Sequence, residues 1–305
     1  MASSQSTSFL LSAADVSWGR RQCYTVALDA GDFTAGQYFT VSVPSENFGS
    51  EAAYYVWADD GVAADPAPGG TGIAADISAA VTEADKVDAI VTALDADAAF
   101  RSKEDPADSS GLTFIMEAEF KGAITTAAAD VDSNVSITEA RAGFGSDLGK
   151  TSGGVEITME TQSVQILADQ TGQLVQDEVY TGQTVEATMS FLEMTPERWK
   201  TIVGSVTGSS YTPSGGTEVT GFGEERLYQS FFDLGGELVL HPSRFDASDR
   251  SRDIMLPLSA PKPSSINFSG EEPQVMEVTF TALLSRDLDS RINLMVFGDN
   301  QQDLR

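Results

Sequence analysis

Three stretches of the chain alternate strictly between apolar and polar residues: 155–160, 185–191 and 276–281. Successive side chains of a β-strand point to opposite faces of a sheet, so an alternation with period two predicts half-buried strands. One face of these strands is aliphatic, sulfur-containing or aromatic. The other reads Glu-Thr-Glu, Glu-Thr-Ser and Glu-Thr-Thr, without Lys or Arg. The pattern predicts a dry face and an acidic, hydroxyl-rich wet face that does not pair with a polyanion.

From residue 153 to the end, the pattern is mostly β with one helix. Thr195 is a good N-cap and Pro196 suits the first helical position, so they predict a helix that ends at Gly204. Its apolar face would contain Trp199, Ile202 and Val203.

Two further strands are expected in this region, at 235–240 and 254–259. Pro257 lacks a backbone donor, which predicts an edge strand for the second. The Ser/Gly/Thr-rich residues 207–220 indicate a mobile loop. Five or more strands with one packed helix are typical of a β-sandwich or a partly rolled sheet.

Residues 22–137 read as a small α+β module. Strand-like runs occupy 24–28, 38–43, 53–57 and 112–116, and Pro66 and Pro68 mark residues 59–72 as a loop. All four runs are rich in β-branched or aromatic residues, which favours strands.

A helix is expected in this module after Thr82. Thr82 and Asp85 resemble a capping box with a shorter acid. Apolar residues then recur with helical spacing and predict one buried stripe. The stripe consists of Ala84, Val87, Val91, Leu94 and Ala98, and it leaves Asp88, Asp95 and Asp97 outside.

The charge distribution suggests two domains. Residues 22–137 hold 20 Asp and Glu against 4 Lys and Arg, whereas the rest holds 26 against 14. This shift, with the Gly-rich residues 143–154, predicts a boundary near 135–150. A strand-like element at 14–19 precedes the module and 140–145 continue after it. We therefore expect one β-domain of residues 1–21 and 138–305, interrupted by an inserted module of 22–137.

Bulk properties exclude several classes of protein. The net charge is −28, and nucleic acid binding by counterion release needs Lys and Arg clusters that this sequence lacks. Adaptation to a saline environment is an alternative explanation of the charge. One cysteine, Cys23, excludes an internal disulfide. No run approaches the ~20 apolar residues of a membrane helix, and residues 1–11 lack the basic start of a secretory signal.

Candidate chemistry is sparse. His241 is the only histidine, with Ser243, Asp246 and Asp249 nearby. Without a G-x-S-x-G elbow this favours a loop histidine over a hydrolase. No Cys/His metal site, phosphate loop or cofactor motif is present. We predict neither an enzyme nor a resident cofactor or metal.

Two acidic patterns leave an alternative open. Acidic loops at 59–60, 130–132 and 246–249 could hold a weak Ca²⁺, although none has EF-hand spacing, which favours solvated loops. Glu156 and Glu186 could act as the acid and base of a glycosidase, but their Thr and Ser flanks favour a solvent-facing strand.

Several blocks resemble the tail tube proteins of long-tailed bacteriophages, in particular siphophage-like major tail proteins. The longest is 145–157, Gly-Ser-Asp-Leu-Gly-Lys-Thr-Ser-Gly-Gly-Val-Glu-Ile. The others are 16–19, 168–172, 180–183, 190–197, 278–283 and 296–299. Residues 22–137 are similar to decoration-type virion modules, in which a Tyr-Tyr-Val-Trp strand leads to a Gly-rich loop and an Ala-rich helix.

This resemblance implies a virion structural protein that self-assembles into stacked homohexameric rings, forming the hollow tail tube through which genomic DNA is delivered. It implies an inner barrel lined by the Glu/Thr face, a packed outer helix at 196–203 with Trp199 inward, and the acidic module on the exterior. The lumen-facing residues would be Glu156, Thr158, Glu160, Glu186, Thr188, Glu277 and Thr279. The loop containing Asp169, Gln170, Thr171 and Gly172 would contact the next ring.

Partners and location follow from the same resemblance. The chain would bind itself and other tail proteins (tape measure, terminator and tail tip), and DNA would pass without specific binding. It would assemble in the host cytoplasm and reside in the virion, with no membrane partner. Terminal arms at 1–12 and 300–305 would become ordered only on assembly. Alternatives are a head–tail completion or decoration protein and, more remotely, a carbohydrate-active or hydrolytic enzyme.

Overall fold

A computed structural model of the 305-residue chain shows two compact units. The inserted unit is Gly19–Ser146, and the split unit combines Met1–Trp18 with Asp147–Arg305. Strands β2 (Ala14–Leu28) and β10 (Phe144–Leu167) carry the chain from one unit to the other. The structure describes all residues except 1, 12, 29–32, 46–49, 131–134, 168–174, 193–194, 205–207, 212–218, 223–226, 247–248, 268–274, 285–292 and 299–305.

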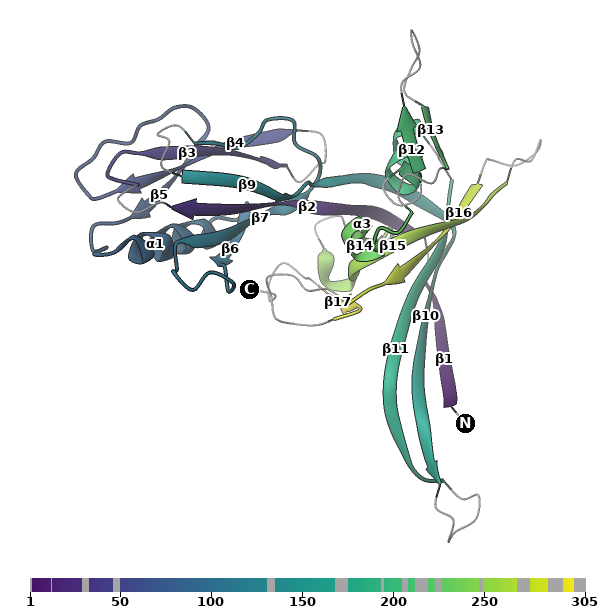
Figure 1. The fold of residues 1–305 in the computed structure, drawn as a ribbon. Helices are drawn as coiled ribbons and strands as arrows, with labels where there is room; N and C mark the ends of the chain where they lie inside the picture. Colours follow the sequence, from purple (N-terminus) through teal and green to yellow (C-terminus); the bar gives the residue numbers. More distant parts are fainter. Residues whose placement is uncertain are drawn as a thin grey trace. The chain divides into compact units, whose positions relative to one another are not determined.

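The protein is mainly β, as the alternation predicts. In the split unit, an antiparallel sheet has the order β1-β10-β11-β16-β15-β14, and β17 also pairs with β15. The bounds of the strands are β1 Ala2–Leu11, β11 Val175–Phe191, β14 Gly236–Pro242, β15 Ile254–Asn267, β16 Val275–Ala282 and β17 Val296–Phe297. β10 and β11 form a long hairpin with β1 along one side (Figure 1). Sequence predictions for these alternating strands are confirmed.

Glycine sets the start of the alternating part of β10. Gly153 and Gly154 have φ of 77° and 91°, a region that disfavours other residues. They lie in a bulge of the β10–β11 ladder between Ser152 and Val155. The bulge fixes which face each later residue of β10 takes, because side chains alternate from Val155 onward.

The helical segments of the split unit are short. Thr195 accepts a hydrogen bond from the Arg198 backbone N–H at 3.3 Å, so the expected cap is confirmed. The helix is α2 (Pro196–Trp199) continued by a π-helix, η2 (Lys200–Gly204). Ile202 and Val203 are buried, whereas Trp199 is half-buried. The remaining elements are α3 (Phe231–Leu234), the 3-10 turn η3 (Arg250–Arg252), β12 (Gly208–Tyr211) and β13 (Val219–Phe222).

Three predictions for the split unit are wrong. The segment 254–259 is internal, because β15 pairs with β14 on one side and with β17 and β16 on the other. Pro257 is tolerated because it lies in the register shift between Leu256 and Ser259, where no ladder partner is needed. Residues 207–220 are not one loop, since β12 and β13 pair as a hairpin. The N-terminal arm is already a strand over Ala2–Leu11, where it completes the edge of β10.

The inserted unit contains two sheets and one long helix. Its first sheet contains β9-β2-β7-β6, with β6 Phe100–Glu104, β7 Thr113–Lys121 and β9 Val135–Arg141. Its second sheet is β5-β4-β3-β8, with β3 Tyr38–Pro44, β4 Glu51–Asp59, β5 Thr71–Asp76 and β8 Ala129–Asp130. Apolar residues of both sheets and the helix share one core, which includes Phe39, Val56, Phe100 and Phe114.

Helix α1 (Glu83–Asp95) begins as predicted. The Thr82 side chain accepts from the Asp85 N–H at 3.2 Å, and the Asp85 carboxylate accepts from the Thr82 N–H at 2.7 Å. The buried stripe is Val87, Ile90 and Leu94. Ala98 was wrongly included, because the helix ends before it, and Ile90 was missed.

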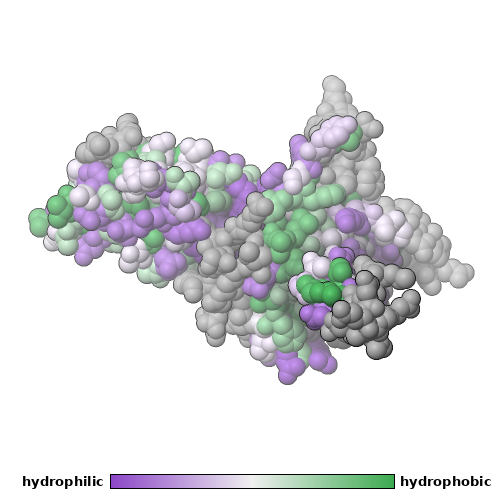
Figure 2. All heavy atoms as spheres, turned by 60° about the horizontal axis from the view of Figure 1, so that its bottom comes forward, coloured by the Kyte–Doolittle hydropathy of each residue, from purple (hydrophilic) through white to green (hydrophobic). Residues whose placement is uncertain are grey.

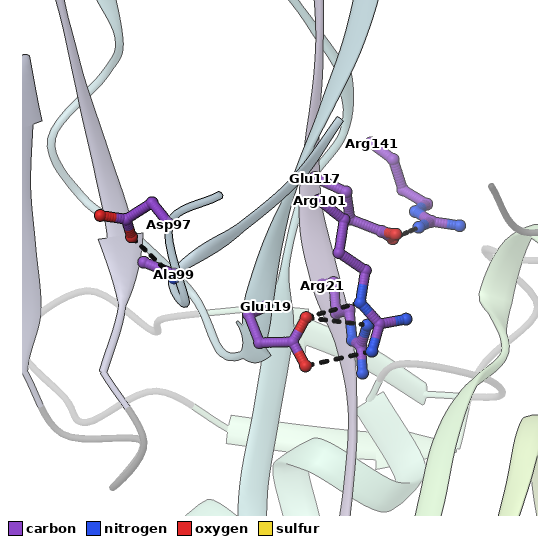
Figure 3. Close-up of polar contacts among 7 residues, drawn as sticks. All are labelled: Arg21, Asp97, Ala99, Arg101, Glu117, Glu119 and Arg141. Atoms are coloured by element: carbon purple, nitrogen blue, oxygen red, sulfur yellow. Dashed lines mark hydrogen bonds and ion pairs between the residues drawn. The ribbon is translucent and has the colours of Figure 1, made fainter. Parts of the chain in front are cut away.

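Charged side chains form a cluster on the face of β7 opposite to the face that packs into the core. Glu119 binds the Arg101 guanidinium at 2.5 and 3.0 Å and lies 3.8 Å from Arg21. Glu117 pairs with Arg141 (Figure 3). Both glutamates are buried, so the arginines supply the charge and the donors that burial removes.

No helix in the described part of the chain is long and apolar enough to cross a membrane.

Candidate functional site: the polar face of the large sheet

The seven residues predicted to line a lumen lie on one face of the split unit's sheet. Residues directly opposite in antiparallel strands project to the same side. Glu156 lies opposite Thr188, and Thr188 lies opposite Thr279. In the next row, Thr158 lies opposite Glu186, and Glu160 follows one row further along β10. Glu277 lies opposite Ser190 in β11. The tertiary structure thus brings together residues up to 123 positions apart in sequence.

Hydroxyls and carboxylates on this polar face bind one another. The hydroxyls of Thr188 and Thr279 are 3.0 Å apart across β11 and β16. Thr281 donates to Glu186 at 3.1 Å, and Ser264 donates to Glu277 at 2.8 Å. Thr281 was expected on this face as part of the alternation 276–281, although not among the lumen residues, whereas Ser264 was not expected there. These bonds orient side chains without neutralising their negative charge.

The opposite face of the same strands is dry. Val155, Ile157, Ala187 and Val278 are fully buried. Phe280 is also fully buried, and its ring centroid lies 5.9 Å from that of Trp18. The apolar half of the alternation therefore anchors the strands in the core and fixes the direction of the polar half.

The polar face is not free of basic residues. Lys262 of β15 lies opposite Thr279 and is exposed, so the expectation from the three alternating stretches is incomplete. β15 has no strict alternation around its prolines, and only the strand pairing shows that it extends this face. The face still has four glutamates to this one lysine.

The distal half of the β10–β11 hairpin reverses the pattern. Gln162, Val164 and Ile166 follow Glu160 at every second position of β10. The pairing of β10 with β1 has no register shift as far as Val164, so the alternation continues on the same face. Val164 lies opposite Val179. Val164, Ile166 and Val179 are 43%, 47% and 46% exposed. The same face therefore carries glutamates near the body of the sheet and exposed apolar residues toward the hairpin tip, where Asp177 also lies opposite Ile166.

The predicted inter-ring residues Asp169, Gln170, Thr171 and Gly172 lie outside the described residues, as do 300–305.

His241 lies in strand β14, not in the loop that the sequence predicted. His241 Nδ1 lies 2.6 Å from Asp253 Oδ1, a partner that the sequence analysis missed. Nε2 is buried, and neither it nor the buried Ser243 hydroxyl has a hydrogen-bond partner in the described structure. Asp249 instead accepts from the Ser251 N–H at 3.2 Å and caps η3. A substrate has no access to the imidazole nitrogen that would act as a base.

Of the acidic loops, residues 131–132 and 247–248 lie outside the described residues, whereas Asp59 and Asp60 bind their own backbone. Asp60 accepts from the N–H groups of Val62 and Ala63 at 2.9 and 2.7 Å, and these bonds lower the pKa of its carboxyl. Asp59 accepts from the Gly61 N–H at 2.8 Å. Among the residues that the structure describes, no three His, Cys, Asp or Glu side chains gather in a metal-binding arrangement.

Comparison with known proteins adds no family assignment. No protein-family model matches the chain, and no curated protein sequence matches it.

Proposed function

We propose that this chain is a virion structural protein, the subunit of a phage tail tube, which self-assembles into stacked hexameric rings around a channel for genomic DNA. The observation that carries the proposal is the polar face, where glutamates and threonines from strands β10, β11 and β16 lie in adjoining rows above a buried apolar face. Such a face suits an aqueous channel through which a polyanion passes without binding.

The charge of the polar face favours passage over retention. Carboxylates repel phosphate, and at physiological salt this repulsion is screened over a Debye length of ~8 Å. Hydroxyls are neutral and well hydrated. A basic lining would release counterions from DNA and hold it. Lys262 stands alone among the glutamates and threonines, so the net charge of the face remains negative.

Exposed apolar side chains support assembly through the split unit. Of 13 large hydrophobic side chains exposed in the described structure, 11 belong to this unit. Val164, Ile166 and Val179 form one such group on the hairpin. Exposed apolar groups of this kind mark protein interfaces. In a ring or stack, neighbouring subunits would cover them.

The edge of the sheet offers a second mode of contact. β1 is the last strand of its sheet in the described structure, so one row of its backbone donors and acceptors has no strand beside it. Exposed edges promote pairing with another chain, and closure into a barrel removes them. Strand pairing around a ring is therefore consistent with the topology.

Negative-stain electron microscopy of the purified, concentrated protein is the first test. We expect hollow rods or rings with a central channel and outward knobs formed by the inserted unit. Dispersed monomers that also fail to join isolated tails would count against the proposal and favour a decoration protein.

A second experiment addresses the lining. The double variant Glu156→Lys/Glu277→Lys should form tubes that retain short double-stranded DNA in co-sedimentation, whereas wild-type tubes release it. Asp88→Lys/Asp95→Lys makes the same charge change on exposed residues of α1 and is the matched control. Equal DNA retention by both variants would contradict a lumenal position for the glutamates.

A further inference from the structure

A groove runs along helix α1 in the inserted unit. Its volume is about 610 Å³, and its walls are α1, the outer face of β5 and the connection between them. Six of the eleven lining residues are alanines and three are aspartates. The small side chains keep the floor close to the backbone. Val87, Ile90 and Leu94 are the buried residues of α1, and none of them lines the groove.

The β5 wall is an edge strand. β5 pairs with β4 in parallel from Thr71 to Asp76 and is the last strand of its sheet in the described residues. Ile73 and Ala75 are buried, while Gly72, Ala74 and Asp76 are exposed. Along such a strand, alternate backbone N–H and C=O groups point away from the neighbouring strand. An added strand can bind these groups.

The groove is electronegative along its length. Asp76, Asp85 and Asp88 line it, and no Lys or Arg does. Asp88 also lies close enough to Glu104 that its hydrogen bond and charge raise the pKa of the Glu104 carboxyl. At the far end, Ala96 follows the last turn of α1, which has no basic residue to offset the negative end of the helix dipole.

We propose that this groove binds an extended, basic segment of another polypeptide, which adds a strand to the free edge of β5. The backbone of the segment would bond to β5, as in other cases where a peptide extends a sheet. Because side chains of a strand alternate, one set would rest on the alanine floor. Lysine or arginine side chains would reach Asp88 and the C-terminal end of α1. This inference is independent of tube assembly.

Fluorescence anisotropy with the full-length protein tests the proposal. The probe is a fluorescein-labelled peptide that alternates lysine and valine. A second probe of equal charge carries proline in place of each valine, so it cannot supply the backbone donors of an added strand. We expect the proline probe to bind at least about tenfold more weakly. Equal affinity for both probes would mean that only net charge attracts them, and would overturn the proposal.

Substitutions in the groove locate the binding. Thr92 is an exposed lining residue, so Thr92→Trp should fill the groove without unfolding α1 and weaken binding about tenfold or more. Val62→Trp adds a ring at a position that is 88% exposed and outside the groove, and should not change the affinity. Asp88→Asn should weaken binding about threefold, with a smaller salt dependence. Unchanged affinity in Thr92→Trp, with native circular dichroism, would refute the site.

Discussion

The two units of this protein are similar in charge and different in exposed apolar surface. The inserted unit has 21 acidic and 7 basic residues, and the split unit has 25 and 11. Both therefore have the same net charge. Among described residues, however, the inserted unit exposes only Val62 and Val81 as large hydrophobic side chains, whereas the split unit exposes 11. In Figure 2 the visible face of the inserted unit is mostly hydrophilic, and a larger hydrophobic area appears on the visible face of the split unit. Negative charge favours solubility in both units, and the exposed apolar side chains of the split unit favour association with other chains.

The units also use their acidic residues differently. In the inserted unit, aspartates accept hydrogen bonds from backbone N–H groups two residues ahead, as Asp65 does with Ala67 and Asp97 with Ala99. The short aspartate side chain suits this turn geometry. On the polar face of the split unit, the acids are glutamates on strands. Part of the negative charge thus stabilises turns, and salt adaptation is not needed to explain that part.

Truncating a buried side chain in the core of each unit should reveal the largest difference between the two units. Phe280→Ala and Phe114→Ala each remove a fully buried ring and should cost about 3–5 kcal/mol. Calorimetry should show that each variant lowers the melting temperature of a different unfolding transition. We expect Phe280→Ala to abolish tubes and Phe114→Ala to preserve them. Loss of tubes in both would show that assembly depends on the inserted unit.

Removing a charge from the buried ion cluster should have the next largest effect on the stability of the inserted unit. Glu119→Gln removes the carboxylate that Arg101 and Arg21 share, and it leaves both cations largely buried. We expect a loss of about 2–3 kcal/mol in the free energy of unfolding, the range for hydrogen bonds to charged groups. Glu83→Gln removes the pair with Lys86 on α1 and should cost less than about 1 kcal/mol. Urea denaturation measures both, and equal losses would show that burial adds nothing to the cluster.

The helix cap should have a smaller effect. Thr82→Ala removes a hydrogen bond to the Asp85 N–H and should destabilise α1 by about 1 kcal/mol. Hydrogen exchange in the first turn of α1 should accelerate accordingly. Thr92→Ala is the control on the same helix, where the change should stay within about 0.5 kcal/mol. Similar exchange rates in both variants would show that the cap does not limit opening.

Acidification should lower the stability of the two units by different amounts, although each carboxyl contributes little. Hydrogen bonds lower the pKa of Asp60, Asp76, Asp85 and Asp108, and those from Thr125 and Thr126 lower that of Glu51 to about 2. All five carboxyls lie in the inserted unit. In the described part of the split unit, hydrogen bonds lower the carboxyl pKa only for Asp249. A lowered folded-state pKa stabilises the fold above the unfolded pKa, and this is lost as pH falls through the folded value.

Calorimetry on acidification below pH about 4 should therefore lower the transition of the inserted unit more than that of the split unit. Asp60→Asn/Asp108→Asn should reduce the difference. An equal decline of both transitions in the wild type would contradict this account.

Local patterns of the sequence predicted local structure well. The alternations at 155–160, 185–191 and 276–281 became strands with the expected dry faces, because side-chain alternation is a property of a single strand. Thr82 and Asp85 predicted the start of α1 because a cap involves neighbouring residues alone. The expected limits of the inserted module, 22 and 137, lie three and nine residues inside those of the compact unit. Boundaries depend on contacts as well as composition.

Predictions failed where a residue's role depended on distant partners. Pro257 is compatible with an internal strand only because a register shift accommodates it. Asp253, the partner of His241, carries no signal in a sequence with many aspartates.

The alternating stretches and the capping residues were enough to predict the main strands of the large sheet, the polar side of each and the start of the long helix. Hydrophobic periodicity and capping act over a few residues, so they can be read along the chain. The fold was needed to establish which strands are neighbours. That placed Glu156, Thr188 and Thr279 in one row, added Lys262 to it, and set β5 beside α1 to form the groove. Strand order and register arise from side chains that meet across long sequence separations, and one strand's pattern does not specify its partner.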